Sequence, residues 1–181
     1  MGRTGAGKST VFQLLLGLYP PESGSMTIGG VEVSAISDGE RRDCISCVEQ
    51  RFSRVPGTVL DQITLGDPGI PAEKAKEAAC LAGIDGAIQA LPQGYNTVCA
   101  EGMFSQGEWQ LLSVARAAAA NSAVLLLDEI TANLDAETEQ RVLAALRRAS
   151  QGRTVLSVSY RVYENLGGRT LEIKPQNREK E

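Results

Sequence analysis

Uninterrupted apolar runs in the chain predict the strands of a buried sheet. Residues 123–127 form such a run, which is typical of a strand covered on both faces of a mostly parallel sheet. Residues 154–159 repeat the pattern, and residues 44–49 are predicted as a third strand. Apolar and polar residues alternate over residues 169–173, which predicts a final strand at the edge of the sheet.

Between these strands, apolar residues recur at helical spacing and predict connecting helices. A first helix over residues 8–18 is expected to stop before Pro20 and Pro21, because proline cannot continue a helix. A hairpin around Gly29 and Gly30 and a short helical turn at residues 38–42 follow. Further helices are predicted over residues 59–65, 72–82, 85–90, 106–120 and 135–150. Strands and helices thus alternate at both ends of the chain around a helical insert. This pattern indicates an α/β fold with a parallel core sheet and a ligand at the carboxyl ends of its strands.

Composition narrows the function only slightly. The chain has 181 residues, of which 43% are hydrophobic, enough for one domain with a real core. Its net charge of −4 gives no electrostatic footprint for nucleic acid, although a local basic patch is compatible with it. No apolar run approaches the ~20 residues that span a bilayer, and the N-terminus lacks a signal-peptide pattern. By itself, the chain is expected to be soluble.

Cys44 and Cys47 form a C-x-x-C pair, which is compatible with zinc binding or a redox pair. The chain contains no second such pair and no histidine. Both cysteines are predicted to lie on one strand, where residues three apart point to opposite faces. The favoured interpretation is that all four cysteines are reduced and pack as small hydrophobic side chains.

The first candidate binding motif lies at the N-terminus and has the pattern G-x-x-x-x-G-K-S. Its residues are Gly2, Arg3, Thr4, Gly5, Ala6, Gly7, Lys8, Ser9 and Thr10. Glycines let consecutive backbone N–H groups surround a phosphate, the lysine reaches the outer oxygens, and the Ser9 hydroxyl is left for Mg²⁺. The helix that follows would also present its N-terminus to the anion.

A second motif, which is acidic, supports the interpretation of the first as a site for phosphate and Mg²⁺. Asp128 follows the apolar run 123–127, where a carboxylate can provide a second anchor for Mg²⁺. Glu129 comes next and points elsewhere, so it can act as a general base on a water in line with the outer phosphate.

With these motifs, the chain resembles the nucleotide-binding domain of ABC transporters. Residues 2–10 are similar to the Walker A motif and residues 124–129 to Walker B, while Gln50 matches the Q-loop glutamine. Residues 104–108 are similar to the LSGGQ signature and residues 132–135, ending at Asp135, to the D-loop. The resemblance implies a P-loop NTPase of three layers, with a mostly parallel core sheet, over residues 1–174. A small helical subdomain at about 58–120 and a polar tail at 175–181 complete it.

The resemblance also implies roles for individual residues. ATP and Mg²⁺ would be the cofactors, with Ser9, Gln50 and Asp128 at the metal and Glu129 as the general base. Two such domains would meet head to tail, so that Ser105, Gln106 and Gly107 serve the partner's ATP, and Asp135 lies at the same interface. The segments at residues 56–59, 94–97 and 100–102 are similar to exporters rather than importers. A transmembrane domain encoded upstream would hold the chain at the cytoplasmic face of the cell membrane.

Three departures from the family pattern stand out. Tyr160 occupies the place of the histidine that contacts the γ-phosphate; it can donate only a neutral hydrogen bond. Gln106 and Glu108 replace a glycine and the glutamine of the signature. The strand expected before the phosphate loop is absent, together with the upstream strands, for which a fragment or a wrong start codon is the simplest explanation.

The main hypothesis is therefore an ATPase that drives export across a membrane, with turnover slowed by Tyr160 and the altered signature. One alternative is a hydrolysis-impaired half of a heterodimeric transporter that binds ATP mainly to hold the pair together. Two others are an inert truncated product and a soluble ABC-type ATPase that acts on DNA or the ribosome. Long coiled-coil or paired-domain insertions are usual in that last class, and none is present.

Overall fold

A parallel three-stranded sheet forms the centre of the chain. The computed structural model describes residues 8–128, 130, 134–158, 168, 169 and 171, and the fold refers to these. The strands are β3 (Ile45–Val48), β4 (Val124–Leu127) and β5 (Thr154–Ser157), in the order β3-β4-β5. Leu125 pairs with Ser46 on one side and Val155 on the other. The predicted parallel core sheet is confirmed.

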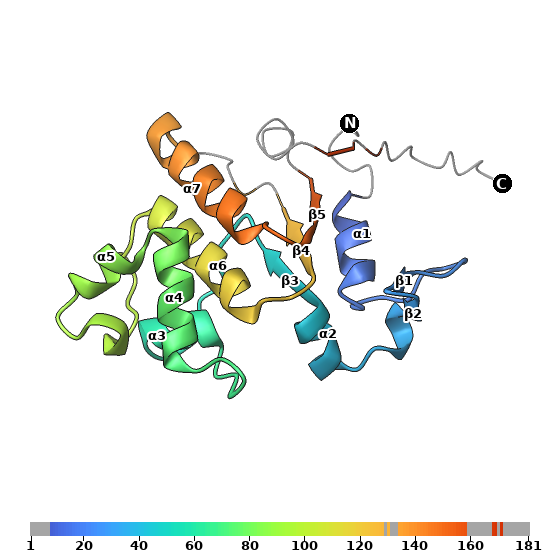
Figure 1. Cartoon of the computed structure of the whole chain (residues 1–181), viewed down its shortest axis with the longest axis horizontal. Coiled ribbons are helices and arrows are strands. Elements are labelled where there is room, and N and C mark those ends of the chain that lie inside the picture. The colour runs from blue at the N-terminus through green and yellow to red at the C-terminus, as the bar shows by residue number, and fades with distance from the viewer. Residues whose placement is uncertain (1–7, 129, 131–133, 159–167, 170, 172–181) are drawn as a thin grey trace.

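The two faces of this sheet are covered by different helices. On one face, Phe12 of α1 (Lys8–Leu15) packs against Ile45 and Leu126. On the other, Leu125 and Leu127 join a larger cluster with α6 (Gln106–Ala120) and α7 (Ala136–Ala149). Successive side chains of a strand point to opposite faces, so an unbroken apolar run fills both clusters. Figure 1 shows the resulting three layers, with α1 on the right of the sheet and α6 and α7 on the left.

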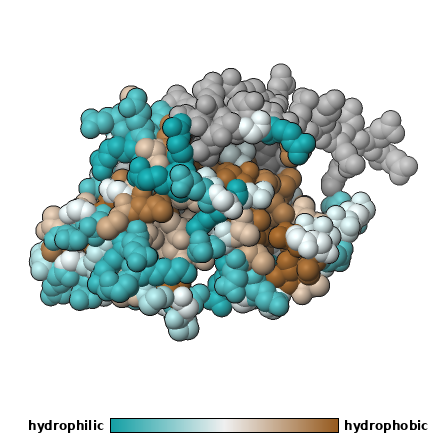
Figure 2. Space-filling view, viewed as in Figure 1, coloured by the Kyte–Doolittle hydropathy of each residue, from teal (hydrophilic) through white to brown (hydrophobic). Residues whose placement is uncertain are grey.

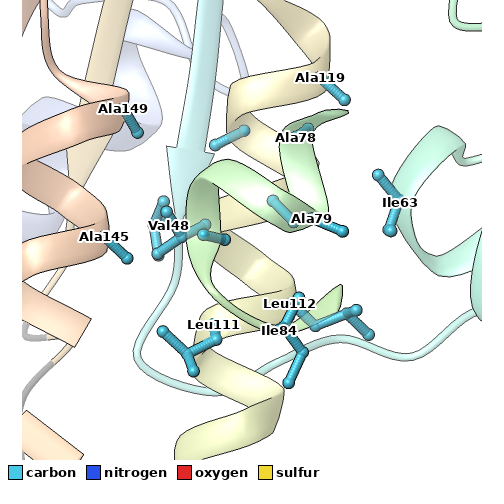
Figure 3. Close-up of a cluster of buried hydrophobic side chains, with 14 of the residues drawn as sticks. Val48, Ile63, Ala78, Ala79, Ile84, Leu111, Leu112, Ala119, Ala145 and Ala149 are labelled. Carbon is cyan, nitrogen blue, oxygen red and sulfur yellow. The ribbon is translucent and has the colours of Figure 1, made fainter. Parts of the chain in front are cut away.

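Three short helices lie beyond α6 on the far side from α1. They are α3 (Val59–Thr64), α4 (Ala72–Ala82) and α5 (Asp85–Gln89). Two of them, α3 and α4, pack on α6, and α5 packs against α4. In Figure 3, Ile84, Leu111 and Leu112 gather where the end of α4 crosses α6, and Ala145 of α7 faces Val48. Alanines at these contacts let the helices approach one another closely. The helical insert predicted from the sequence therefore forms one continuous core with the sheet.

Two arginines bind the carboxyl ends of α4 and α6. The Arg148 Nε donates to the Leu81 carbonyl of α4 at 2.6 Å, and Arg153 donates to the Ala117 and Ala118 carbonyls of α6 at 2.9 and 3.3 Å. The last carbonyls of a helix have no partner within it, and a cation there is favoured by the helix dipole. Burial lowers the pKa of Arg153. These bonds fix α4 and α6 relative to α7 and β5.

The N-terminal part of the chain corrects two predicted boundaries. Helix α1 ends at Leu15 instead of residue 18, because Gly17 adopts a left-handed conformation (φ 67°) and the Leu18 N–H donates to the Gln13 carbonyl at 2.9 Å. Helix α2 (Asp38–Cys44) is longer than the predicted turn. The hairpin of β1 (Thr27–Ile28) and β2 (Val31–Glu32) is confirmed as antiparallel. Two 3₁₀ helices lie at Val33–Ala35 and Gly94–Asn96.

The longer α2 also corrects the interpretation of the cysteine pair. Cys44 is the last residue of α2, so only Cys47 lies on β3, and both pack against the same cluster around Phe12. They do not point to opposite faces of one strand. Burial, with the nearby charges of Glu49 and Asp128, raises the pKa of the Cys47 thiol to about 12. Cys47 is therefore a protonated, unreactive thiol at neutral pH, and all four cysteines are free.

Surface character differs between the neighbouring helices α1 and α2. Figure 2 shows hydrophobic residues gathered over α1, with hydrophilic residues over α2 beside it. Among the helices of the described ranges, none is long and apolar enough to cross a bilayer. The edge strand predicted over residues 169–173 and the polar tail at 175–181 fall largely or wholly outside the described residues.

Candidate functional site

The carboxyl ends of the three parallel strands and the first turn of α1 meet at one edge of the sheet. Figure 1 shows this edge at the top of the view, where α1 begins at Lys8 and where β3, β4 and β5 all end. Gln50 follows β3 by two residues, and Asp128 follows β4 directly. Open α/β sheets bind ligands at this edge. The structure thus brings the start of the predicted phosphate-loop helix to the same edge as Gln50 and Asp128.

Asp128 is held in position by the sheet. Its backbone N–H donates to the Val48 carbonyl at 3.1 Å, which continues the pairing of β3 and β4 by one residue. The residue is half-buried, and its negative charge contributes to the raised pKa of Cys47. Its oxygens are of the type that hard cations such as Mg²⁺ prefer.

Other predicted site residues lie at the start of α1 or beyond the described ranges. Lys8 and Ser9 are the first two residues of α1, and Thr10 is exposed on its first turn. Outside the described residues lie Gly2, Arg3, Thr4, Gly5, Ala6, Gly7, Glu129 and Tyr160. Their roles stay predictions.

The loop that begins at Gln50 is attached to α6. The Gln110 side-chain amide donates to the Gln50 carbonyl, and the ring of Phe52 stacks on Trp109 with centroids 5.0 Å apart. The Arg116 guanidinium lies 4.2 Å from the Phe52 centroid and donates to the Ser53 carbonyl. Burial lowers the pKa of Arg116 to about 10, so it stays charged at neutral pH. This cluster fixes the position of Gln50 relative to α6.

Sequence reasoning missed these supporting residues. Their partners are 57 to 64 positions away in the chain, which no local pattern reveals. The one available signal was Trp109, the only tryptophan of the chain, directly after the 104–108 motif. Phe52, Trp109 and Gln110 line a cavity of about 370 Å³ that Gln50 and Gln106 also border. Two predicted site residues on different elements therefore border one cavity.

A second group of predicted site residues lies at two helix N-termini. Ser105 is the N-cap of α6, and its Oγ accepts the Glu108 N–H at 3.3 Å. Asp135 is the N-cap of α7, and its Oδ1 accepts the Thr138 N–H at 3.0 Å. That hydrogen bond lowers the pKa of Asp135, which keeps the carboxylate ionised. Both caps satisfy donors that a helix leaves unpaired.

These two N-termini are packed together at Gly107. The glycine is buried against Thr138, and a methyl group built on it would overlap the Thr138 Cγ2 methyl. Ser105 and Asp135, the exposed caps of the two helices, thus lie on the same part of the surface. Figure 1 places α6 and α7 on the left of the sheet and α1 on the right. The signature-like residues and the start of α1 therefore lie on opposite sides of the same chain.

Replacing Gly107 with alanine is expected to lower the free energy of unfolding by about 1–3 kcal/mol, because the new methyl has no space beside Thr138. Urea unfolding followed by circular dichroism measures this. Thr138→Ser removes the overlapping methyl, so the double variant should recover most of the loss. A Gly107→Ala variant as stable as the parent would show that α6 and α7 are not tightly packed here.

Comparisons with known proteins identify the family. A family model described as "ABC transporter" matches residues 1–132. The "ABC multidrug transporter MDR2" of Trichophyton tonsurans is 42% identical over 167 residues, which are 90% of this chain and 12% of that protein. The "Alpha-hemolysin translocation ATP-binding protein HlyB" of Proteus vulgaris is 36% identical over 164 residues, 90% of this chain and 23% of that protein. "P-glycoprotein 14" of Caenorhabditis elegans is 35% identical over 164 residues, 90% of this chain and 12% of that protein.

The chain thus spans only a small part of the length of these relatives. The family model nevertheless covers well over half of the chain, including the phosphate loop, the 104–108 motif and Asp128. The matched region also contains the parallel sheet strands β3 and β4 with α6 between them. The chain therefore belongs to the ABC transporter family, as a nucleotide-binding ATPase domain.

Proposed function

We propose that this chain is the ATPase engine of an ABC exporter, which binds and hydrolyses MgATP to drive a substrate across a membrane. The observation that carries the proposal is the split arrangement of the site. The start of α1, Gln50 and Asp128 form one group at the strand ends, and Ser105 and Asp135 belong to a second group at the N-termini of α6 and α7. Helix α1 lies on one face of the sheet, and α6 and α7 lie on the other. An ATP site that needs both groups must be completed by a second chain.

The first group would hold this chain's own nucleotide. Backbone N–H groups of residues 2–10 would surround the phosphates, with Lys8 reaching the outer oxygens and the N-terminus of α1 adding its dipole. Ser9, Gln50 and Asp128 would hold Mg²⁺, which neutralises phosphate charge when it is bound. The half-buried Asp128, anchored through Val48, fits this role, since an oxygen ligand on a rigid strand end suits a hard cation.

Hydrolysis would depend on Glu129. Its carboxylate would accept a proton from the water that attacks the γ-phosphorus, while the bond between that phosphorus and the bridging oxygen of ADP breaks. Tyr160 would stand beside the γ-phosphate, where its hydroxyl can donate one neutral hydrogen bond.

The second group would serve the nucleotide of the partner chain. Ser105, with the backbone N–H groups of Gln106 and Gly107 at the N-terminus of α6, would contact the outer phosphate, and Asp135 would lie at the same interface. The partner would be a second nucleotide-binding domain, bound head to tail. ATP would close the pair, and hydrolysis would reopen it.

A transmembrane domain would couple this cycle to export and hold the chain at the cytoplasmic face of the membrane. The names of the relatives support export, because they describe a multidrug transporter and a protein of hemolysin translocation. The small share of those proteins that this chain matches leaves ample length for such a domain in them.

Two measurements on the whole chain test the proposal. Isothermal titration with MgATP should give saturable binding at one site per chain, and sedimentation velocity should show pairs that form only when nucleotide is present. Chains that bind no ATP, or that pair equally well without it, would contradict the proposed function. GTP and ADP serve as nucleotide controls.

Replacing Tyr160 with histidine is expected to raise the steady-state rate of ATP hydrolysis about tenfold. Histidine can carry a positive charge near neutral pH, so its hydrogen bond to a developing phosphate charge is stronger than that of tyrosine. Phosphate release at saturating MgATP measures the effect, with Tyr19→His, at an exposed position after α1, as the control. Equal rates for the parent and the Tyr160→His variant would show that this position does not limit turnover.

A further inference from the structure

The carboxylate of Glu108 is bound to the residue that is proposed to contact the partner's phosphate. Glu108 Oε2 accepts the Ser105 backbone N–H and the Ser105 hydroxyl, both at 2.8 Å. The Ser105 Oγ in turn accepts the Glu108 N–H at 3.3 Å. In this capping box the hydroxyl of Ser105 gives its only proton to Glu108, so that proton is not available to another anion.

A phosphate and this carboxylate would compete for the same donors. For Ser105 to bind the outer phosphate of the partner's ATP, its hydroxyl must leave Glu108. Even after that exchange, the Glu108 carboxylate stays within one helical turn of a highly charged triphosphate. Like charges at such separations repel appreciably outside bulk water. Glu108 therefore opposes the phosphate twice, through its hydrogen bonds and through its charge.

We propose that Glu108 is a built-in competitor of the partner's ATP: its carboxylate occupies Ser105 and raises the ATP concentration at which two chains pair. This rests on the proposed function, because it takes Ser105 as the contact to the partner's phosphate. Pairing then requires more ATP than filling of the chain's own site does. The chain binds nucleotide first and pairs only when Ser105 is released.

The chain itself provides a matched control for this inference. Helix α2 begins with the same arrangement, in which Glu40 Oε2 accepts the Ser37 N–H at 3.0 Å and the Ser37 hydroxyl at 2.6 Å. The hydrogen bonds from Ser37 lower the pKa of Glu40. Glutamine occupies this position of a capping box as well as glutamate does. Glu108→Gln and Glu40→Gln therefore remove one charge each from equivalent structures, and only Glu108 adjoins the proposed phosphate contact.

The test measures pairing of the full chain by sedimentation velocity, with Mg²⁺ and increasing amounts of the nonhydrolysable β,γ-imido analogue of ATP. Glu108→Gln is expected to pair at an analogue concentration about tenfold lower than the parent does, because one like charge is removed close to the phosphate. Glu40→Gln is expected to pair as the parent does. Affinity for the analogue in dilute, unpaired chains should be the same in all three, and thermal unfolding verifies that each is folded.

The outcomes separate this inference from the proposed function. If all three chains bind the analogue and pair at the same concentration, or if none pairs, the role of Glu108 is wrong while nucleotide binding stands. If Glu40→Gln pairs as readily as Glu108→Gln, the effect is one of net charge, and the role of Glu108 is again wrong. If no chain binds the analogue, the proposed function fails and the inference fails with it.

Discussion

Replacing Glu129 with glutamine is expected to lower the rate of ATP hydrolysis at least about a hundredfold, with ATP affinity changed less than about threefold. Glutamine has nearly the same shape but cannot accept a proton, and a positioned general base contributes roughly 10²–10⁴ in rate. Binding should persist, because the variant keeps the phosphate loop, Ser9 and Asp128. Single-turnover release of phosphate from radiolabelled ATP measures the rate, and equilibrium titration measures the affinity.

Glu137→Gln is the control for this comparison, since Glu137 is an exposed residue in the first turn of α7. Its rate should equal that of the parent. A Glu129→Gln rate within twofold of the parent would mean that another group accepts the proton. A parent that is already as slow as the variant would instead favour the hydrolysis-impaired half of a heterodimeric transporter.

Replacing Lys8 with alanine is expected to weaken ATP binding about 10- to 100-fold, because a charge-assisted hydrogen bond to the outer phosphate is lost. Hydrolysis should fall with it at low ATP concentration. The folded state should be unaffected, since the change lies at the first residue of α1. Isothermal titration with MgATP measures the affinity.

Lys76→Ala is the matched control. Lys76 is a partly exposed lysine of α4 that forms a surface ion pair with Glu73 at 2.7 Å, and such pairs contribute little to stability. Its removal should leave ATP affinity unchanged. Should Lys8→Ala bind ATP as tightly as the parent, the loop at residues 2–10 would not be the phosphate site.

Much of the fold could be predicted because local patterns determine it. The bounds of α4 and α6 agree with the helical spacing of their apolar residues, and β4 with its unbroken apolar run. The errors concern the ends of two helices, α1 and α2. Gly17 ends α1 before the prolines do, because its left-handed conformation overrides the periodicity there. Helix α2 begins where it was predicted, at the capping box of Ser37 and Glu40, but continues to Cys44.

The candidate site was predictable as a set of motifs but not as an arrangement. The sequence placed Gln50 and Asp128 after predicted strands, whereas only the fold shows that these two strands, β3 and β4, are parallel neighbours. The contact between Gly107 and Thr138 joins residues 31 positions apart, and the bond from Gln110 to Gln50 spans 60. Such contacts depend on how α6 packs against its neighbours, which periodicity does not encode. Ser105 and Glu108, by contrast, match the capping-box pattern S-x-x-E in the sequence itself.

We propose that this chain hydrolyses ATP in a site completed by a second chain. The rate of phosphate release per chain at saturating MgATP, measured over a wide range of protein concentration, tests this. A composite site predicts a specific rate that rises with protein concentration towards a plateau and that disappears in the Glu129→Gln variant. A specific rate independent of concentration, or one that Glu129→Gln leaves unchanged, would contradict the account.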